Sequence, residues 1–182
     1  MPEKNHSTQA LRADETYREA SVAYGGALSR LARGYEAEPE KQRDLLQEIR
    51  IAIWKSLGRF NGTCSLRTWV FRIAHNVAAS HVLRERRRKR VTMVGVEELD
   101  AAASTPDSQQ AVAEQQALAR LTDLIRQLIP VDRLVILSYL EGMDAEAISD
   151  LTGLSTTNVS TKVHRIKEVL RRHFDARDSD EQ

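Results

Sequence analysis

The feature that most constrains the fold is a stretch near the C-terminus, residues 156–173, which has the period of an α-helix. Val159, Val163, Ile166 and Leu170 recur at helical spacing and therefore share one side. Hydroxyl and basic side chains occupy the positions between them. Such a helix can dock on a core by one face and offer hydrogen-bonding groups and cations on the other, as a helix in a DNA major groove must. A surface helix with a solvated basic face has the same pattern.

The residues before this stretch favour the DNA-binding interpretation. Asp144 is a predicted N-cap for a short helix, and Gly153 is its predicted end. Ser155 then caps the helix that begins at 156. A short helix, a glycine-containing turn and a longer helix with a polar and basic face predict a helix-turn-helix motif. Helical hairpins in plain bundles can imitate this order.

Two further helices are expected in the C-terminal half. Ser108 is the predicted cap of the first, and Pro130 begins the second, which ends at Gly142. The expected apolar positions of the first are Val112, Leu118, Leu121, Leu124, Ile125 and Leu128; those of the second are Leu134, Ile136, Leu137 and Leu140.

The N-terminal half begins with residues 1–12, which are polar and predicted to be disordered. A first helix is expected from about Asp14 to Ala32, with Val22, Leu28 and Leu31 as its apolar residues and Gly25-Gly26 as an interruption. A second helix starts near Pro39 and ends at Gly58. Its apolar residues Leu46, Ile49, Ile53 and Leu57 are spaced as on one helical face.

A third helix follows the loop 58–64, with Ser65 as its predicted N-cap. Its expected buried side consists of Leu66, Trp69, Val70, Ile73 and Val77. The helix continues into residues 84–90, RERRRKR, where six of seven side chains are cationic. A helix C-terminus favours cations, but this density exceeds that role and indicates contact with nucleic acid.

Residues 91–107 lose the helical period and become small and acidic, so they are predicted to be a flexible linker between domain 13–90 and domain 108–174. Residues 175–182 form a short acidic tail. The expected fold is therefore all-α, with two small helical domains and a helix-turn-helix in the second. The single cysteine, Cys64, excludes an internal disulfide. No apolar run approaches the roughly 20 residues of a membrane span. A cytoplasmic protein without membrane insertion is expected.

Two segments carry a resemblance to a known family. Residues 131–174 resemble the fourth domain of bacterial sigma factors. Residues 43–54, RDLLQEIRIAIW, and 58–82, GRFNGTCSLRTWVFRIAHNVAASHV, resemble their second domain. The order of the two domain-like segments is similar to that in the compact extracytoplasmic-function group, whose members have only these two domains and a linker. The resemblance implies a factor that binds core RNA polymerase, directs it to −35/−10 promoters and assists melting of the −10 region.

The resemblance also implies roles for individual residues. Asp44, Gln47 and Glu48 match the site that docks on the clamp helices of the polymerase, and the flap is the second polymerase contact. The −10 element would be bound by Arg59, Phe60, Asn61, Arg67, Arg72, Asn76, Arg86, Arg87 and Arg88. The −35 element would be bound by Thr156, Thr157, Asn158, Ser160, Thr161, Lys162, His164 and Arg165. An anti-sigma factor is a further implied partner, and the acidic linker would run toward the active-site cleft.

Other function classes have less support. The residues form no catalytic constellation, and no cofactor or metal is expected: the histidines lack metal-ligand spacing and there is no glycine-rich phosphate loop. A LuxR-type regulator that binds DNA without replacing a sigma subunit is the main alternative, since its DNA-binding helix is similar. A protein that uses a DNA-binding fold to contact only another protein is the third interpretation.

Overall fold

The computed structural model describes the backbone of residues 3–89 and 110–178, and the side chains of 13–88 and 116–173. These residues are helical, with turns between helices, and they confirm the all-α prediction. The chain divides into two compact units, Met1–Lys89 and Arg90–Gln182, which we call unit 1 and unit 2. The linker 91–107, the expected cap Ser108 and residues 179–182 lie outside the described residues.

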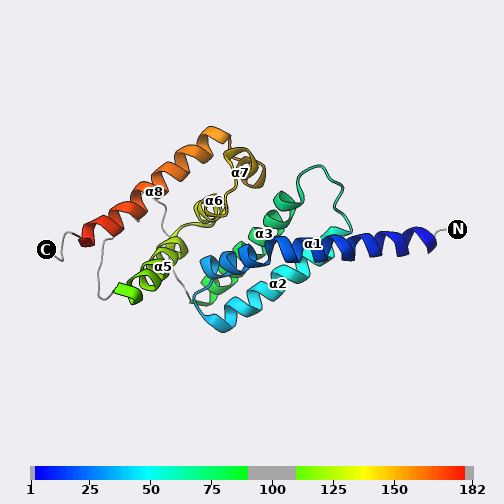
Figure 1. The fold of residues 1–182 in the computed structure, drawn as a ribbon, viewed down its shortest axis with the longest axis horizontal. Coiled ribbons are helices and arrows are strands. Elements are labelled where there is room, and N and C mark those ends of the chain that lie inside the picture. Colours follow the sequence, from blue (N-terminus) through cyan, green and yellow to red (C-terminus); the bar gives the residue numbers. More distant parts are fainter. Residues whose placement is uncertain (1–2, 90–109, 179–182) are drawn as a thin grey trace. The chain divides into compact units, whose positions relative to one another are not determined.

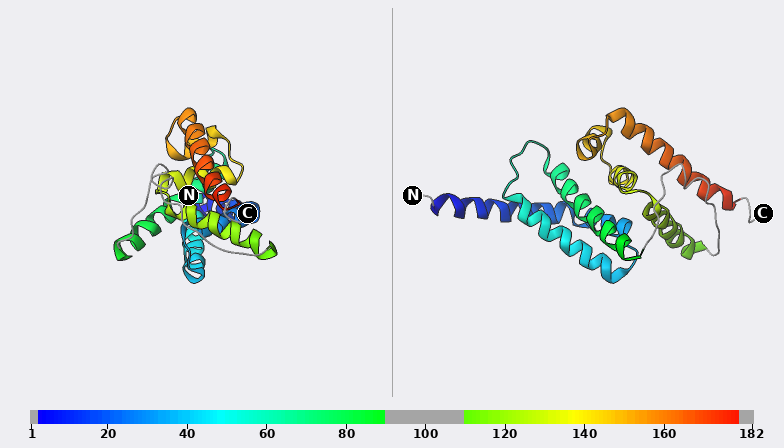
Figure 2. Two further views of the ribbon diagram at one scale, coloured as in Figure 1. Left: turned by 90° about the vertical axis from the view of Figure 1, so that its left-hand side faces the viewer. Right: turned by 180° about the vertical axis from the view of Figure 1, so that it is seen from behind.

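Unit 1 consists of three helices that pack on one another: α1 (Glu3–Tyr35), α2 (Pro39–Leu57) and α3 (Leu66–Lys89) (Figure 1). The right-hand view of Figure 2 shows the same three helices from behind. The core contains Leu28 and Leu31 of α1, Leu45, Ile49 and Ile53 of α2, and Val70, Phe71, Ala74 and Ala78 of α3. Burial of these apolar side chains is the main source of the stability of the unit.

The first helix differs from the expectation in three ways. It begins at Glu3, within the segment predicted to be disordered, and it continues without a break through Gly25-Gly26. Glycine in a helix costs only about 1 kcal/mol relative to alanine, which the packing of Leu28 and Leu31 offsets. Val22, expected to be buried, is 88% exposed.

The buried faces of α2 and α3 contain the predicted Ile49, Ile53, Leu57 and Val70, together with residues that were not predicted. The stripe on α2 begins at Leu45, which is fully buried, whereas Leu46 is half-buried. On α3, Val70 is buried as predicted, but the other fully buried positions are Ala74 and Ala78, and the predicted Leu66, Ile73 and Val77 are only half-buried. Alanines give a weak apolar signal, and this is why the sequence pattern pointed to neighbouring positions instead.

Unit 2 contains α5 (Gln110–Gln127), α6 (Pro130–Leu140), α7 (Ala145–Thr152) and α8 (Thr156–Asp178) (Figure 1). The helix-turn-helix is α7 and α8. Asp144 Oδ1 accepts a hydrogen bond from the backbone N–H of Ala147 at 2.8 Å, as an N-cap does, and Gly153 ends α7 in the left-handed conformation at φ +74°. Ser155 Oγ accepts from the N–H of Asn158 at 3.3 Å and starts α8.

Two residues expected to be apolar core in unit 2 are exposed instead. Leu118 is 64% exposed and Leu140 is 53% exposed. Each lies on a helix whose buried side is formed by other residues: Ile125 on α5, with Leu128 directly after that helix, and Val135 and Ile136 on α6. The helix α8 extends to Asp178, past the predicted start of the acidic tail at 175.

Candidate nucleic-acid interface

The polar face of α8 is presented to solvent because its opposite face is buried. Val159, Val163 and Ile166 are at most 8% exposed and pack against the other helices of unit 2. Of the predicted DNA-facing residues, these are exposed: Thr156, Thr157, Asn158, Ser160, Thr161, His164 and Arg165. An exposed row of this kind, on a helix fixed by its other side, can enter a groove of duplex DNA.

The hydroxyl groups on this face are hydrogen-bonded to the helix itself. Ser160 Oγ donates to the carbonyl of Thr156 at 3.0 Å, and Thr161 Oγ1 donates to the carbonyl of Thr157 at 2.9 Å. Their protons are used within the helix, as is common for mid-helix serine and threonine. These two hydroxyls therefore offer lone pairs, and they accept from amino groups of bases or from ordered water more readily than they donate.

Lys162 is the predicted DNA-binding residue that the structure does not place on the open face. Its ammonium lies 2.6 Å from Oδ1 of Asp132, and its side chain is 30% exposed. Asp132 itself is on α6 and is 1% exposed. The prediction counted Lys162 among the exposed cations, whereas here it forms an ion pair between two helices.

Arg133, which follows Asp132 on α6, is also buried, at 1% exposure. Its guanidinium donates to the carbonyl of Leu128 at 2.9 Å and also to that of Arg126. The Arg126 carbonyl lies in the last turn of α5, where helix carbonyls lack partners within the helix, and the Leu128 carbonyl follows directly after the helix. Arg133 therefore joins α5 to α6.

A hollow of about 260 Å³ lies in unit 2 between α6, α7 and α8, with Met143, Ile148 and Val159 among its lining residues. Lys167 and Tyr139 lie at the edge of this hollow, where Lys167 Nζ is 5.3 Å from the centre of the Tyr139 ring in a cation–π contact. Ser160 and His164, both predicted DNA-facing residues, also line it. The polar face of α8 is thus continuous with an apolar depression.

In unit 1, the loop between α2 and α3 is a compact turn. Asn61 Oδ1 accepts from the N–H of Thr63 at 3.2 Å and from its hydroxyl at 2.9 Å, while Gly62 has φ +76°. An Asn-Gly pair in this arrangement is a typical turn. The carboxamide oxygen of Asn61 therefore holds the loop, and Asn61 remains exposed.

Two aromatic residues fix this loop to the helices. The rings of Phe60 and Trp69 are tilted at 57° with their centres 5.5 Å apart. Trp69 Nε1 donates to Ser56 Oγ at 3.0 Å, which joins α3 to the end of α2. Phe60 is only half-buried, so part of its ring remains accessible for stacking.

The predicted base-reading residues of α3 have unequal exposure. Asn76 is exposed, whereas Arg67 and Arg72 are half-buried, and the Arg67 guanidinium lies 5.7 Å from the centre of the Phe71 ring. At the end of the helix, Arg86, Arg87 and Arg88 are all exposed, and Arg88 forms an ion pair with Glu85 at 3.2 Å. Ser65 Oγ accepts from the N–H of Thr68 at 3.0 Å, confirming the predicted N-cap.

The predicted polymerase-binding residues lie together on the outer face of α2. Asp44, Gln47 and Glu48 are exposed, at positions that share one side of a helix. Glu48 forms an ion pair with Arg84 of α3 at 2.7 Å, with both side chains about half exposed. Asp44 is the more accessible charge for a partner.

Two histidines of α3 contact residues at the end of α1 and directly after it, Tyr35 and Glu36. His75 is 1% exposed, and burial lowers its pKa to about 3, so its imidazole is neutral. His81 Nε2 lies 2.9 Å from Glu36 Oε2. Burial by itself would raise the pKa of Glu36, but hydrogen bonds from the Glu38 backbone, the His81 ring and the Ala37 backbone outweigh it, and the pKa is lowered from 4.5.

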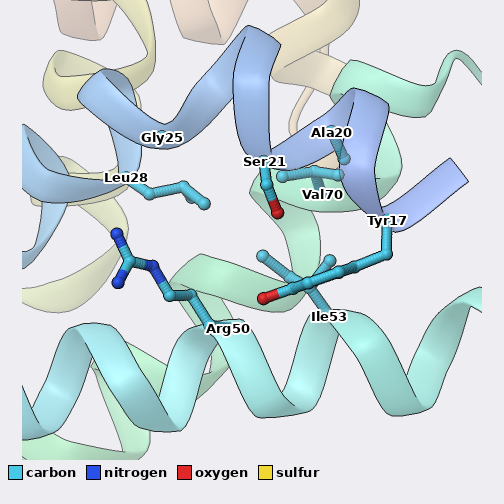
Figure 3. A pocket seen from close by; sticks show the side chains of 8 residues that line it. All are labelled: Tyr17, Ala20, Ser21, Gly25, Leu28, Arg50, Ile53 and Val70. Carbon is cyan, nitrogen blue, oxygen red and sulfur yellow. The ribbon is translucent and has the colours of Figure 1, made fainter. Parts of the chain in front are cut away.

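A second hollow of about 260 Å³ lies between α1 and α2 of unit 1 (Figure 3). Arg50 extends from α2 toward α1, and the side chain of Tyr17 extends from α1 toward α2. The apolar lining residues Ala20, Leu28, Ile53 and Val70 are each at most 3% exposed. A ligand would cover little additional apolar surface here. Elsewhere in the described residues, no group of three or more His, Cys, Asp or Glu side chains could hold a metal ion.

Comparison with known proteins decides between the interpretations. Residues 22–88 match the family described as Sigma-70 region 2, and residues 118–170 match Sigma-70 region 4. The RNA polymerase sigma factor CarQ of Myxococcus xanthus is 32% identical over 148 residues, which cover 80% of this chain and 79% of CarQ. The chain is an extracytoplasmic-function sigma factor. It is a promoter-directing subunit of RNA polymerase, and the LuxR-type alternative has no support.

Other relatives agree with this assignment. The RNA polymerase sigma-E factor of Streptomyces avermitilis is 30% identical over 158 residues, covering 85% of this sigma factor and 82% of the relative. The extracytoplasmic-function sigma factor SigX of Bacillus subtilis is 26% identical over 76% of this chain and 73% of its own length. The fold is also similar to that of CnrH, solved in complex with the cytosolic domain of CnrY, with a TM-score of 0.63, 22% identity and coverage of 93% and 96%.

The sequence reasoning missed Asp132, the residue that holds Lys162, although one signal was available. Lys162 is three residues after Val159 and four before Ile166, so it lies on the inward side of the helix. A cation on that side requires a buried partner. Among the described helices of this sigma factor, none is long and apolar enough to cross a membrane.

Proposed function

We propose that this sigma factor recognises a two-part promoter, with α8 in the major groove of the −35 duplex and the surface formed by the 58–65 loop and α3 on the −10 element. The observation that carries the proposal is the exposed polar row of α8, whose central members are Thr157, Thr161, His164 and Arg165. Arg165 supplies a cation for a base edge or phosphate, and the hydroxyls supply acceptors.

At the −10 element, the proposed role of unit 1 is to hold bases after they leave the stack. Unstacking costs a few kcal/mol per base, which aromatic stacking in a protein site can offset. Phe60 is half-buried and its ring contacts that of Trp69, and Asn76 is exposed on the same helix as Trp69. Asn76 is the proposed base contact, and Arg86 and Arg87 are proposed phosphate contacts.

The proposed docking site on core polymerase is the outer face of α2 with Asp44, Gln47 and Glu48. Its carboxylates suit a partner surface that carries arginines. A protein inhibitor is also proposed as a partner, since the related CnrH was solved with the cytosolic domain of CnrY. Adding such an inhibitor should prevent the sigma factor from joining core polymerase.

The test is selection of promoters from a library of random DNA by the complex of core polymerase and the sigma factor. Two separated blocks of preferred sequence are expected. Arg165→Ala should change only the upstream block, and Asn76→Ala only the downstream block. A single block, or an upstream block unaffected by every substitution on α8, would show that the assignment of the two surfaces is wrong.

A further inference from the structure

The inward side of α8 contains a lysine in the middle of an apolar stripe. Val159, Ile166 and Val169 are at most 4% exposed, and the spacing of Lys162 from each of them places it on the same side of the helix. A lysine at such a position can direct its ammonium to a carboxylate on the facing helix, and a buried carboxylate without such a partner would be strongly unfavourable.

The partner is an acidic residue on a different helix. Asp132 lies in the first turn of α6, and its carboxylate is 2.6 Å from the Lys162 ammonium. The aspartate side chain is 2% exposed and that of the lysine 30%, so the contact is closed on the aspartate side and partly open on the lysine side. A short, charged hydrogen bond of this kind restrains how α8 can rotate and slide on α6.

We infer that Lys162 is a positioning residue of the recognition helix, which acts through Asp132 and makes no contact with DNA. The inference rests on the proposed function of α8. The ion pair fixes the rotation at which Thr157, Thr161 and Arg165 face outward together. Loss of either charge leaves the other without its partner and allows α8 to change its seating on α6.

Base recognition is sensitive to such a change. Direct contacts to base edges depend on the exact position of each side chain, whereas phosphate contacts are long-range and tolerant. The pair is therefore expected to control the ratio of affinity for the preferred −35 sequence to affinity for mixed-sequence DNA. It is not expected to control the dependence of affinity on salt, which reflects the number of phosphates neutralised.

The experiment measures binding of the full chain, with core polymerase, to two fluorescent duplexes. One carries the −35 block obtained from the selection, and the other has mixed sequence. Affinities are measured at a series of salt concentrations for the unaltered chain, Lys162→Met, Lys162→Arg, Asp132→Asn and the double variant Lys162→Met with Asp132→Asn. Circular dichroism of each variant reports folding. Arg165→Met is the matched control, because Arg165 is an exposed cation of the outward row on the same helix.

If the inference is right, Lys162→Met and Asp132→Asn each lower the specificity ratio about tenfold, and the double variant lowers it no further than either alone, because the two residues act as one pair. Lys162→Arg keeps the ratio. The salt slope, which is the steepness with which the logarithm of affinity falls with the logarithm of salt concentration, stays unchanged in all four variants. Arg165→Met lowers this slope by roughly 0.9.

Three results would overturn the inference. A slope lowered in Lys162→Met but not in Asp132→Asn would make Lys162 a phosphate contact. An unchanged ratio in both single variants would leave the pair with a role in stability only, because loss of folded protein reduces both affinities equally. Additive effects in the double variant would mean that the residues act separately.

If the single variants do not fold, one further variant still tests the inference. Asp132→Leu combined with Lys162→Met replaces the pair by apolar side chains, which buried ion pairs often tolerate. It should fold and keep the salt slope of the unaltered chain, and a slope lowered by about one would overturn the inference. If the unaltered chain shows no preference for the selected duplex and Arg165→Met has no effect, the proposed function of α8 fails, and the positioning role fails with it.

Discussion

The hydroxyl oxygen of Tyr35 lies 3.0 Å from Nδ1 of His75, and this hydrogen bond joins the last turn of α1 to the middle of α3 inside unit 1. The two rings are also in edge contact, with their centres 5.7 Å apart. Both residues are at most 5% exposed. A polar pair in the core of a small helical unit must remain hydrogen-bonded and neutral, which makes the unit sensitive to acid.

The first prediction concerns pH. Burial lowers the pKa of His75 from 6.5 to about 3, so between these values the unfolded chain takes up a proton that the folded chain does not. Stability therefore falls as pH drops below 6.5. For His75 alone, the expected loss from pH 7 to pH 5 is about 2 kcal/mol. Both tryptophans, Trp54 and Trp69, lie in unit 1, so their fluorescence reports its unfolding by urea.

The control for this prediction is His75→Gln, which removes the titrating group. The variant is less stable, but its stability should change less between pH 7 and pH 5 than that of the unaltered chain. Glu36 does not affect this comparison between pH 7 and pH 5. Its pKa is lowered in the folded unit, so the stability that it contributes is lost only as pH falls below about 4.5. Equal pH dependence in both chains would mean that His75 is protonated in the folded unit.

The second prediction concerns Gly25 in α1. A Cβ atom built at Gly25 meets nothing within 4 Å, and the residue is helical. Gly25→Ala should therefore raise the free energy of unfolding of unit 1 by about 0.5–1 kcal/mol. Gly62→Ala is the matched control: its Cβ also has space, but φ is +76°, so this substitution should lower stability by about 1 kcal/mol. Urea unfolding followed by fluorescence measures both, and a destabilising Gly25→Ala would contradict the packing described for α1.

The third prediction concerns docking on core polymerase. Asp44→Arg reverses an exposed charge on the outer face of α2, and affinity for core polymerase should fall about tenfold or more. Glu48 is a less direct probe because Arg84 already neutralises it. Glu19→Arg, which reverses another exposed charge, on α1, is the control and should bind normally. Competition for core polymerase against a labelled sigma factor gives the affinities. Equal weakening by both reversals would point to a general charge effect.

The fourth prediction concerns the basic end of α3. Replacing Arg86 and Arg87 by alanine should lower the salt slope of promoter binding by roughly 0.7–0.9 for each phosphate that is no longer neutralised, with the same preference for the −10 sequence. Arg88 is left in place because it is paired with Glu85. Arg18→Ala, on α1, is the control and should leave the slope unchanged. A slope that does not respond to the double replacement would remove these arginines from the interface.

Sequence reasoning succeeded where the determining interactions are local. The caps at Ser65, Asp144 and Ser155 act on N–H groups three residues away, and the end of α7 at Gly153 depends on the conformation of that residue alone. The helical period of α8 correctly gave its buried face, because valine and isoleucine carry a strong signal.

It failed where the determining partner is distant in sequence. Lys162 and Asp132 are separated by 30 residues, and no local pattern identifies the aspartate as the partner of the lysine. The same holds for His75, whose partner Tyr35 is 40 residues away, and for the alanines at 74 and 78, whose burial depends on how closely α1 and α2 approach α3. These interactions follow from the packing of the helices, which the period alone does not specify.

The most direct test of the central claim is run-off transcription from the selected promoter, with purified core polymerase and with or without this chain. A transcript of defined length is expected only when the chain is present; it should be lost with Asp44→Arg and restored by an excess of that variant. Arg165→Ala should also reduce the transcript, and altering the −35 block should remove this difference. A transcript that forms equally without the chain, or whose amount does not depend on either promoter block, would show that the chain does not direct the polymerase to this promoter.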